Sequence, residues 1–172
     1  MTETDPKTIA ESATRHYEQG DFEQSARLFA EAALAYEQAQ NLFDAAEMRN
    51  NQSVALLKGG DAQAALDALQ GLGDVFEQAN DVYRQAFFIG NKAAALESLG
   101  RLEEAEQCYR DSAQLLEAVA EYQLRATINK SLALVCLRRF KLLDSVRAYG
   151  AYLKHTIAFA YFRARVWFPS RK

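Results

Sequence analysis

The chain has few of the residues that end helices or favour strands. Its 172 residues include only two prolines and eight glycines, and runs of valine, isoleucine and threonine are rare. Because β-branched residues are enriched in strands, their scarcity argues against a β-sheet domain. Alanine, leucine, glutamate and glutamine are abundant instead, and these residues favour helices. The sequence therefore predicts an all-α protein, long enough for one domain with a hydrophobic core.

Residues that carry catalytic or metal chemistry are also scarce, with two cysteines and two histidines in the whole chain. Cys108 and Cys136 lie far apart and predict reduced, buried thiols rather than a disulfide or a metal site. The sequence contains no zinc-protease motif, no phosphate-binding loop and no nucleophile elbow. We therefore expect a protein that is not an enzyme and has no catalytic residues, no metal and no cofactor.

Charge is unevenly distributed along the chain. Residues 1–137 carry 11 basic and 22 acidic side chains, a net charge of −11, whereas residues 138–172 carry nine basic side chains and one acidic, a net charge of +8. The acidic group Glu103, Glu104 and Glu106 falls where a helix is expected to start, and negative charge is favourable there. We interpret it as structural rather than as an acid–base pair. The acidic, polar N-terminus resembles no secretory signal, so we expect a cytoplasmic protein.

One short phrase recurs every 40 residues, at 19–29, 59–69 and 99–109, with a fainter copy at 139–149. The second residue of the phrase is a glycine in three copies, and Phe140 replaces it in the fourth. Five residues later comes a small residue, and four residues after that a large one, which is the spacing of one helix face. The aligned columns are Gly20, Gly60 and Gly100, then Ser25, Ala65, Ala105 and Ser145, then Phe29, Leu69, Tyr109 and Tyr149.

A second pair of columns lies upstream of each glycine, so every unit is expected to be a helical hairpin. The small column is Ala13, Ser53, Ala93 and Ala133, followed three residues on by His16, Leu56, Leu96 and Cys136. We read His16 as a packing residue at the edge of the core. The small columns permit close helix approach and the large columns fill the space beside them. A hairpin of this kind cannot bury its apolar face alone, so successive hairpins are expected to stack.

Start and stop residues support the same division. Glycine suits the end of the first helix of each unit, and Asp21 or Asp61 can cap the second. Asp5 and Pro6 predict the first helix start, and Asn41, Asp81 and Glu121 open the later units. Gly71 and Gly73 fall inside the second helix of the second unit, where they predict either tight packing, a bend or a weak helix. The expected units span about 6–40, 41–80, 81–120 and 121–150.

These columns resemble the tetratricopeptide repeat. Gly20, Phe22, Ser25 and Phe29 match its phrase, as do Gly100, Leu102, Ala105 and Tyr109. The period of 40 exceeds the usual length of about 34, and the usual tryptophan and closing proline are missing. Forty-residue variants of this kind resemble soluble NSF attachment proteins and some bacterial repeat proteins. HEAT-type pairs share the length but lack the phrase. The resemblance implies an all-α, right-handed superhelix of about four antiparallel hairpins.

In the tetratricopeptide family the first helix of each hairpin lines a concave groove that binds a peptide or partner protein. Alignment places several candidate binding residues on that groove: Tyr17, Asn50, Asn51, Lys58, Phe87, Asn91, Lys130 and Arg138. Asn51 and Asn91 share a column, so their amides are expected either to hold an extended peptide or to brace neighbouring helices. The family's carboxylate clamp needs basic residues beside successive asparagines, and the third unit lacks them. We do not expect such a clamp.

Residues 151–172 form a basic, aromatic segment that includes Arg163, Arg165 and Trp167. Three interpretations are open: a capping helix, a surface for another subunit or partner protein, or a segment lying on an anionic membrane. The favoured function is therefore a protein-binding adaptor or scaffold. The alternatives are a membrane-peripheral or assembly factor docked by this segment, and a self-assembling structural subunit. Nucleic acid binding is not expected, because the body of the chain is acidic.

Overall fold

The computed structural model describes residues 5–118, 121–139 and 142–167, and these residues form helices and turns with no strand among them. The helices are α1 (Pro6–Glu18), α2 (Phe22–Gln38), α3 (Leu42–Lys58), α4 (Ala62–Ala68), α5 (Leu72–Gln78), α6 (Val82–Ser98), α7 (Leu102–Leu115), α8 (Tyr122–Arg138) and α9 (Leu142–Trp167), with a short 3₁₀ turn at Leu116–Ala118.

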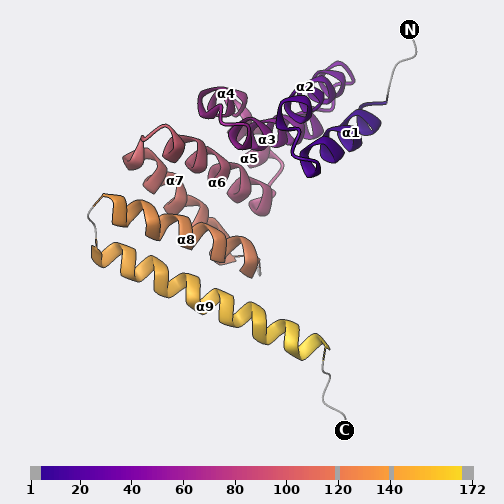
Figure 1. Cartoon of the computed structure of the whole chain (residues 1–172). Coiled ribbons are helices and arrows are strands. Elements are labelled where there is room, and N and C mark those ends of the chain that lie inside the picture. Colours follow the sequence, from indigo (N-terminus) through magenta and orange to yellow (C-terminus); the bar gives the residue numbers. More distant parts are fainter. Residues whose placement is uncertain (1–4, 119–120, 140–141, 168–172) are drawn as a thin grey trace.

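The helices pair into four hairpins that stack in chain order (Figure 1). The first helix of each hairpin, here called the A helix, is α1, α3, α6 or α8. The second, called the B helix, is α2, the α4–α5 pair, α7 or α9. Each of the first three B helices packs against its own A helix and against the A helix that follows it, as α2 does with α3 and α7 with α8. The fourth, α9, packs against its own A helix, α8. This arrangement is the all-α superhelix of stacked hairpins that the sequence predicts.

The glycines of the repeat occupy equivalent bends between the two helices of a hairpin. Gly20, Gly60 and Gly100 have φ of 81°, 93° and 74°, in the left-handed region that glycine adopts at little cost. Gln40 and Asn80 have φ of 58° and 56° at the turns between hairpins. In most of these turns the next backbone N–H donates to the carbonyl five residues earlier: Asp21 to His16, Asn41 to Tyr36, Asp61 to Leu56, and Arg101 to Leu96.

Side-chain caps begin most of the helices, as predicted. The side-chain oxygens of Asp5, Asp21, Asn41, Asp61 and Asp81 each accept a hydrogen bond from a backbone N–H in the first turn that follows. Glu121 precedes α8 but makes no such bond. His16 is half-buried and its Nδ1 lies 3.0 Å from the Asp21 carboxylate, so it contacts the cap of α2. The same local chemistry therefore sets the start of most helices in the first three hairpins.

The small columns of the sequence lie in the core. Ala13, Ser53 and Ala93 are fully buried, and Ala133 is 4% exposed. Ser25, Ala65 and Ala105 are also fully buried. The side chain of Ser145 and the turn residue Phe140 lie outside the described residues. Close helix packing thus explains why these positions keep small side chains.

The second B helix is interrupted at the glycines for which the sequence left tight packing, a bend or a weak helix open. It is divided into α4 and α5, and Gly71 at the junction has φ of 76°. The break turns α5 so that Phe76, 1% exposed, packs between the rings of Phe43 and Phe88. Gly73 lies within α5, where an added Cβ would meet Phe88 at an ordinary contact distance of 3.6 Å. Of the three alternatives predicted for these glycines, the structure therefore shows a bend, at Gly71.

The last B helix is also longer than expected. α9 is one helix of 26 residues, Leu142–Trp167, and it extends beyond the start of α8 (Figure 1). Tyr122, at the start of α8, stacks on His155 with ring centroids 6.5 Å apart. The boundary expected at residue 150 between the repeat domain and a C-terminal segment falls inside this helix.

Candidate functional site

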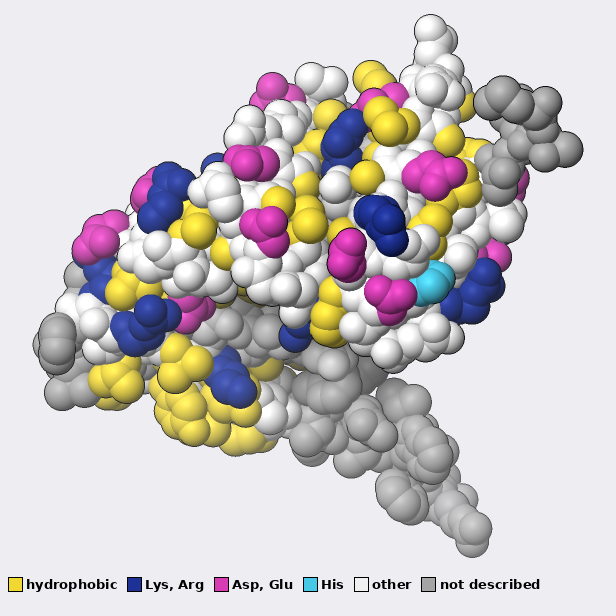
Figure 2. Space-filling model, turned by 45° about the horizontal axis from the view of Figure 1, so that its top comes forward, with side chains coloured by type: hydrophobic (Ala, Val, Ile, Leu, Met, Phe, Trp, Pro, Cys, Tyr) yellow, Lys and Arg dark blue, Asp and Glu magenta, His cyan; other side chains and the backbone are white. Residues whose placement is uncertain are grey.

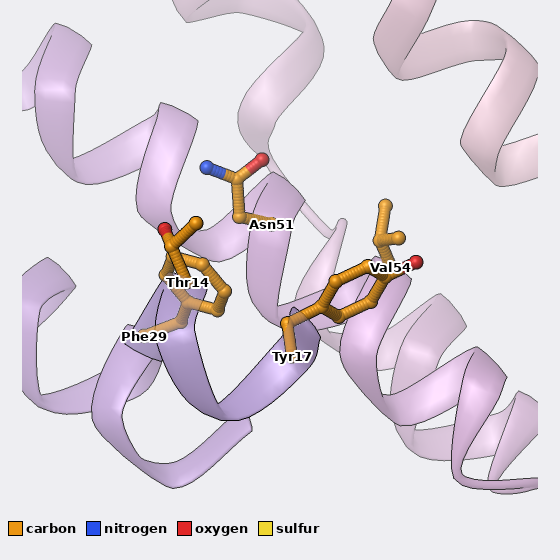
Figure 3. A pocket seen from close by; sticks show the side chains of 5 residues that line it. All are labelled: Thr14, Tyr17, Phe29, Asn51 and Val54. Atoms are coloured by element: carbon orange, nitrogen blue, oxygen red, sulfur yellow. The ribbon is translucent and has the colours of Figure 1, made fainter. Parts of the chain in front are cut away.

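A first hollow lies between α1, α2 and α3, on the face formed by the A helices. It has a volume of about 240 Å³ and is lined by Thr14, Tyr17, Phe29, Asn51 and Val54 (Figure 3). Phe29 is buried and Tyr17 is half-buried. The Tyr17 ring packs edge-on against Phe22, with centroids 5.4 Å apart. Most of the wall is therefore apolar, and its polar groups are the amide of Asn51 and the hydroxyls of Thr14 and Tyr17.

A second hollow, of about 160 Å³, lies between α3, α5 and α6. Its wall contains an aromatic pair: Tyr83 and Phe87 stack with their rings 5° from parallel and their centroids 6.3 Å apart. Tyr83 is 40% exposed. Asn51 lines this hollow as well as the first, so it stands between the two.

The asparagines of the predicted ladder divide into two roles. Asn50 is 5% exposed, and its Oδ1 accepts a hydrogen bond of 3.1 Å from Nδ2 of Asn91, which joins α3 to α6. This pair braces neighbouring A helices. Asn51 is half-buried, and its side chain has no hydrogen-bond partner within the described part of the chain. Asn51 is therefore the amide that is available to a ligand.

An ion cluster borders the second hollow. Arg84 pairs with Glu47 of α3 and with Asp81, whose Oδ2 lies 2.7 Å from Nη1. Its guanidinium also lies 5.3 Å from the centre of the Phe43 ring. Hydrogen bonding, first from the backbone N–H of Arg84, lowers the pKa of Asp81. The two carboxylates neutralise the arginine and leave the cluster with one net negative charge, and the pairs join α6 to α3.

The remaining predicted groove residues lie apart from these hollows. Lys58 is exposed at the end of α3. Lys130 is exposed on α8 and borders two hollows between α8 and α9. Arg138 pairs with Glu97 at 3.1 Å, and the Tyr109 hydroxyl donates to the other oxygen of Glu97 at 3.0 Å. Arg138 thus links α8 to α6 rather than standing ready for a ligand.

The predicted docking residues Arg163, Arg165 and Trp167 lie on the final turns of α9. Their side chains lie outside the described residues. The membrane-docking and self-assembly alternatives that depend on these residues stay predictions.

Of the acidic residues Glu103, Glu104 and Glu106, only Glu106 is buried, and its carboxylate holds helices together. Glu106 is 4% exposed and pairs with Arg110 at 2.9 Å and with Arg139. Arg110 also reaches Asp144 of α9 at 3.2 Å, so the network joins α7, α8 and α9. Glu106 therefore links the three helices through its pairs with two guanidinium groups.

The sequence predicted two buried thiols, but only Cys136 is buried and Cys108 is half-buried. Cys108 and Cys136 form no disulfide within the described residues. Burial raises the pKa of Cys108, which keeps it a thiol at neutral pH. The described residues contain no cluster of three metal-ligating side chains. No helix among the described residues is long and apolar enough to span a membrane.

Alignment of columns missed Tyr83 and Arg84, which shape the second hollow. Tyr83 and Phe87 are four residues apart on α6, and an aromatic pair at that spacing on an A helix was the available signal. Arg84 has no basic counterpart at residue 44, which is an aspartate. A search for repeated columns therefore passes over it.

Comparison with known proteins supports the fold but no closer relationship. No protein-family model matches the chain, and no curated protein matches it. Among solved structures, the chain is similar to the nearly identical TPR-like repeats of a Podosopora anserina protein described as a kinesin light chain. That structure has a TM-score of 0.72 at 14% identity, covering 83% of this chain and 70% of the other.

Two further structures agree. A singly substituted form of the Podosopora anserina repeats has a TM-score of 0.74 at 15% identity, covering 99% of this chain and 82% of the other. MamA has a TM-score of 0.55 at 17% identity, covering 86% of this chain and 96% of the other. At these identities the likeness is one of fold: the chain has the fold of a tetratricopeptide-type helical repeat protein.

Proposed function

We propose that this protein is a non-catalytic scaffold that binds an extended segment of a partner protein along the face of its A helices. The observation that supports this proposal most directly is the position of Asn51, an amide without a partner among the described residues, between two hollows. An amide offers two donors and an acceptor, which suits the backbone of an extended peptide. The helical repeat fold presents such surfaces, and no described cluster suits metal chemistry.

The chemistry of the hollows limits what the segment offers. The first hollow is mainly apolar, and the second has an aromatic wall beside an arginine already neutralised by Glu47 and Asp81. Both favour uncharged or apolar side chains. Because side chains alternate along an extended chain, residues that enter the two hollows are expected to lie on one side of the peptide.

Affinity capture from the native cell tests this function. Partners recovered with the wild-type chain should be lost with Asn51→Ala and kept with Gln107→Ala, which removes an exposed amide from the B helix α7. Recovery of the same partners with the wild type, with Asn51→Ala and with Gln107→Ala would contradict the proposal. Localisation of the tagged chain in the same cells would test the expected cytoplasmic location, which stays a prediction.

A further inference from the structure

The last hairpin exposes side chains at positions that the earlier hairpins bury. Tyr149 is 51% exposed, whereas its equivalents Phe29, Leu69 and Tyr109 are 5%, 3% and 3% exposed. The exposed stripe continues along α9 at helical spacing, with Val146 at 62%, Leu153 at 44% and Ile157 at 68%. Single exposed apolar residues are common, but a continuous stripe marks an interaction site.

In the earlier hairpins, the next A helix covers this column. Phe29 belongs to a core cluster with Ala55, against which Met48 and Leu56, also of α3, pack. Tyr109 belongs to a cluster that contains Ile128 of α8. No A helix follows α9 within the described residues. The stripe on α9 is thus a stacking surface without the helix that covers its equivalents.

A hollow between α8 and α9 marks the place of that helix. It has a volume of about 370 Å³, and its wall includes Leu134, Leu137 and Tyr149. These residues are 120 positions after Thr14, Tyr17 and Phe29, which line the first hollow. There, Asn51 and Val54 of α3 form the opposite wall, whereas the hollow of the last hairpin has only α8 and α9 to line it.

We call the surface formed by Leu134, Leu137, Val146, Tyr149, Leu153 and Ile157 the C-terminal stacking surface. Leu134 and Leu137 are 49% and 52% exposed. Figure 2 shows hydrophobic side chains gathered along the lower left edge of the molecule, with basic side chains beside them.

The charges around this surface are basic. Lys130, Arg147 and Lys154 are exposed on α8 and α9. The one acidic residue of these two helices, Asp144, is paired with Arg110 at 3.2 Å. An occupant with acidic flanks is therefore favoured by charge complementarity.

A second copy of this chain fits the surface poorly. In a head-to-tail stack, α1 of the second copy would supply the covering helix. Its exposed residues Thr8 and Arg15 stand where α6 has the buried Phe88 and Ala95, so that face of α1 is polar. In a two-fold arrangement centred on the stripe, antiparallel α9 helices would bring Arg147 and Lys154 of the two copies together, which like charge disfavours.

We propose that the C-terminal stacking surface binds an amphipathic α-helix of a partner protein, with acidic residues on both sides of an apolar stripe, in the place of a next A helix. The A helices α3, α6 and α8 each have 17 residues, which sets the length of helix that the surface accepts. A groove between two helices receives the side-chain ridge of a third helix. An anionic membrane shares the charge preference but presents no such ridge.

Peptide binding to the full chain tests the proposal. The probe is a synthetic amphipathic helix of about 17 residues, with leucine along one stripe and glutamate on both sides. A scrambled peptide of the same composition and a version with lysine in place of glutamate are the comparison probes. Calorimetry at low salt should show binding of the glutamate-flanked helix alone, and failure of this helix to bind would overturn the proposal.

Variants locate the binding. Val146→Ser with Leu153→Ser should weaken binding at least about tenfold. The matched control is Leu34→Ser with Leu42→Ser, since these leucines are 51% and 61% exposed on other helices; it should leave binding unchanged. Lys130→Glu with Lys154→Glu should reverse the preference toward the lysine-flanked helix. Equal loss in the control pair, or no reversal, would overturn the assignment.

Two other occupants would be recognised by their own results. Flotation with vesicles of phosphatidylcholine and phosphatidylserine, lost with Val146→Ser and Leu153→Ser while no helix binds, would replace the proposal with a membrane surface. A doubling of mass in sedimentation that the same variant abolishes would replace it with a dimer interface. Asn51→Ala should leave helix binding unchanged, so this proposal and the proposed function succeed or fail separately.

Discussion

The first three hairpins and the last one share a sequence pattern but not a setting. Phe29, Leu69 and Tyr109 are enclosed by the A helix that follows each of them, whereas Tyr149 at the same position is half exposed. The repeat pattern therefore indicates which B-helix side chains would contact the following A helix if such a helix is present. Whether that neighbour is present is decided by the number of hairpins, which the pattern does not state.

The two ends of the stack differ in the same way. The side of α1 that no B helix covers among the described residues carries exposed polar residues such as Thr8 and Arg15. The open side of α9 keeps the apolar stripe of an internal repeat. The uncovered side of α1 is thus polar, whereas the uncovered side of α9 is apolar and suits the packing of a further helix.

The largest expected difference between the hairpins comes from truncating the equivalent aromatic side chains Phe29 and Tyr149. Phe29→Ala should lower the free energy of unfolding by about 3–5 kcal/mol, because it leaves a cavity in the core. Tyr149→Ala should lower it by less than about 1 kcal/mol, because half of that ring already faces solvent. Urea denaturation of both variants measures the difference. Similar losses would mean that the last hairpin is covered as fully as the first.

Glycine substitutions should have opposite signs in the two regions. Gly60→Ala should destabilise the chain by about 1–2 kcal/mol, since φ at this turn is 93°. Gly150→Ala should stabilise it by about 0.5–1 kcal/mol, because Gly150 is helical and an added Cβ meets nothing within 4 Å. Thermal denaturation should show the melting temperature falling with the first change and rising with the second. A fall with both would place Gly150 in a closer contact than the structure gives.

The smallest expected difference concerns helix caps. Asp81→Ala should cost about 1 kcal/mol, because the carboxylate accepts a hydrogen bond from the backbone N–H of Arg84 at 3.0 Å. Glu121→Ala should cost no more than about 0.5 kcal/mol, because Glu121 makes no side-chain cap bond before α8. Denaturant titration of each variant measures these losses, and equal losses would show that Glu121 caps α8 in solution.

The Asp81 cap should also depend on pH. Its pKa is lowered in the folded chain, first by the hydrogen bond from the Arg84 backbone N–H. The stabilisation is present above the unfolded-state pKa of about 4 and is lost as pH falls through the lower folded-state value. Asp81→Asn keeps an acceptor but cannot titrate. The stability difference between wild type and Asp81→Asn should therefore shrink below about pH 4, and a difference that is constant with pH would contradict this.

Much of the fold could be predicted because it depends on local chemistry. The turn glycines, the caps at Asp21 and Asp61, and the small columns each act within one or two turns of their own position, so a single sequence displays them. The break at Gly71 was harder to predict. It accompanies the packing of Phe76 between Phe43 of α3 and Phe88 of α6, which belong to two adjacent hairpins.

The candidate site could be predicted only in part, because a column alignment does not show which side chains of neighbouring helices pair with each other. Alignment paired Asn51 with Asn91, but the hydrogen bond joins Asn50 to Asn91 and leaves Asn51 to the hollows. Arg138 is engaged with Glu97, from the preceding A helix, which a column alignment does not reveal. The pattern identified the face, and only the packing shows which of its side chains are available.

Hydrogen exchange along α9 tests the central claim most directly. Backbone amides of residues 146–155 should exchange faster than those of the equivalent residues 106–115. The reason is that α8 packs on α7, whereas no A helix follows α9 in the described structure. The glutamate-flanked helix should slow exchange at 146–155 toward the rate at 106–115. Equal protection of both segments in the free protein, or no slowing with the helix present, would contradict the claim that the last hairpin is an open stacking surface.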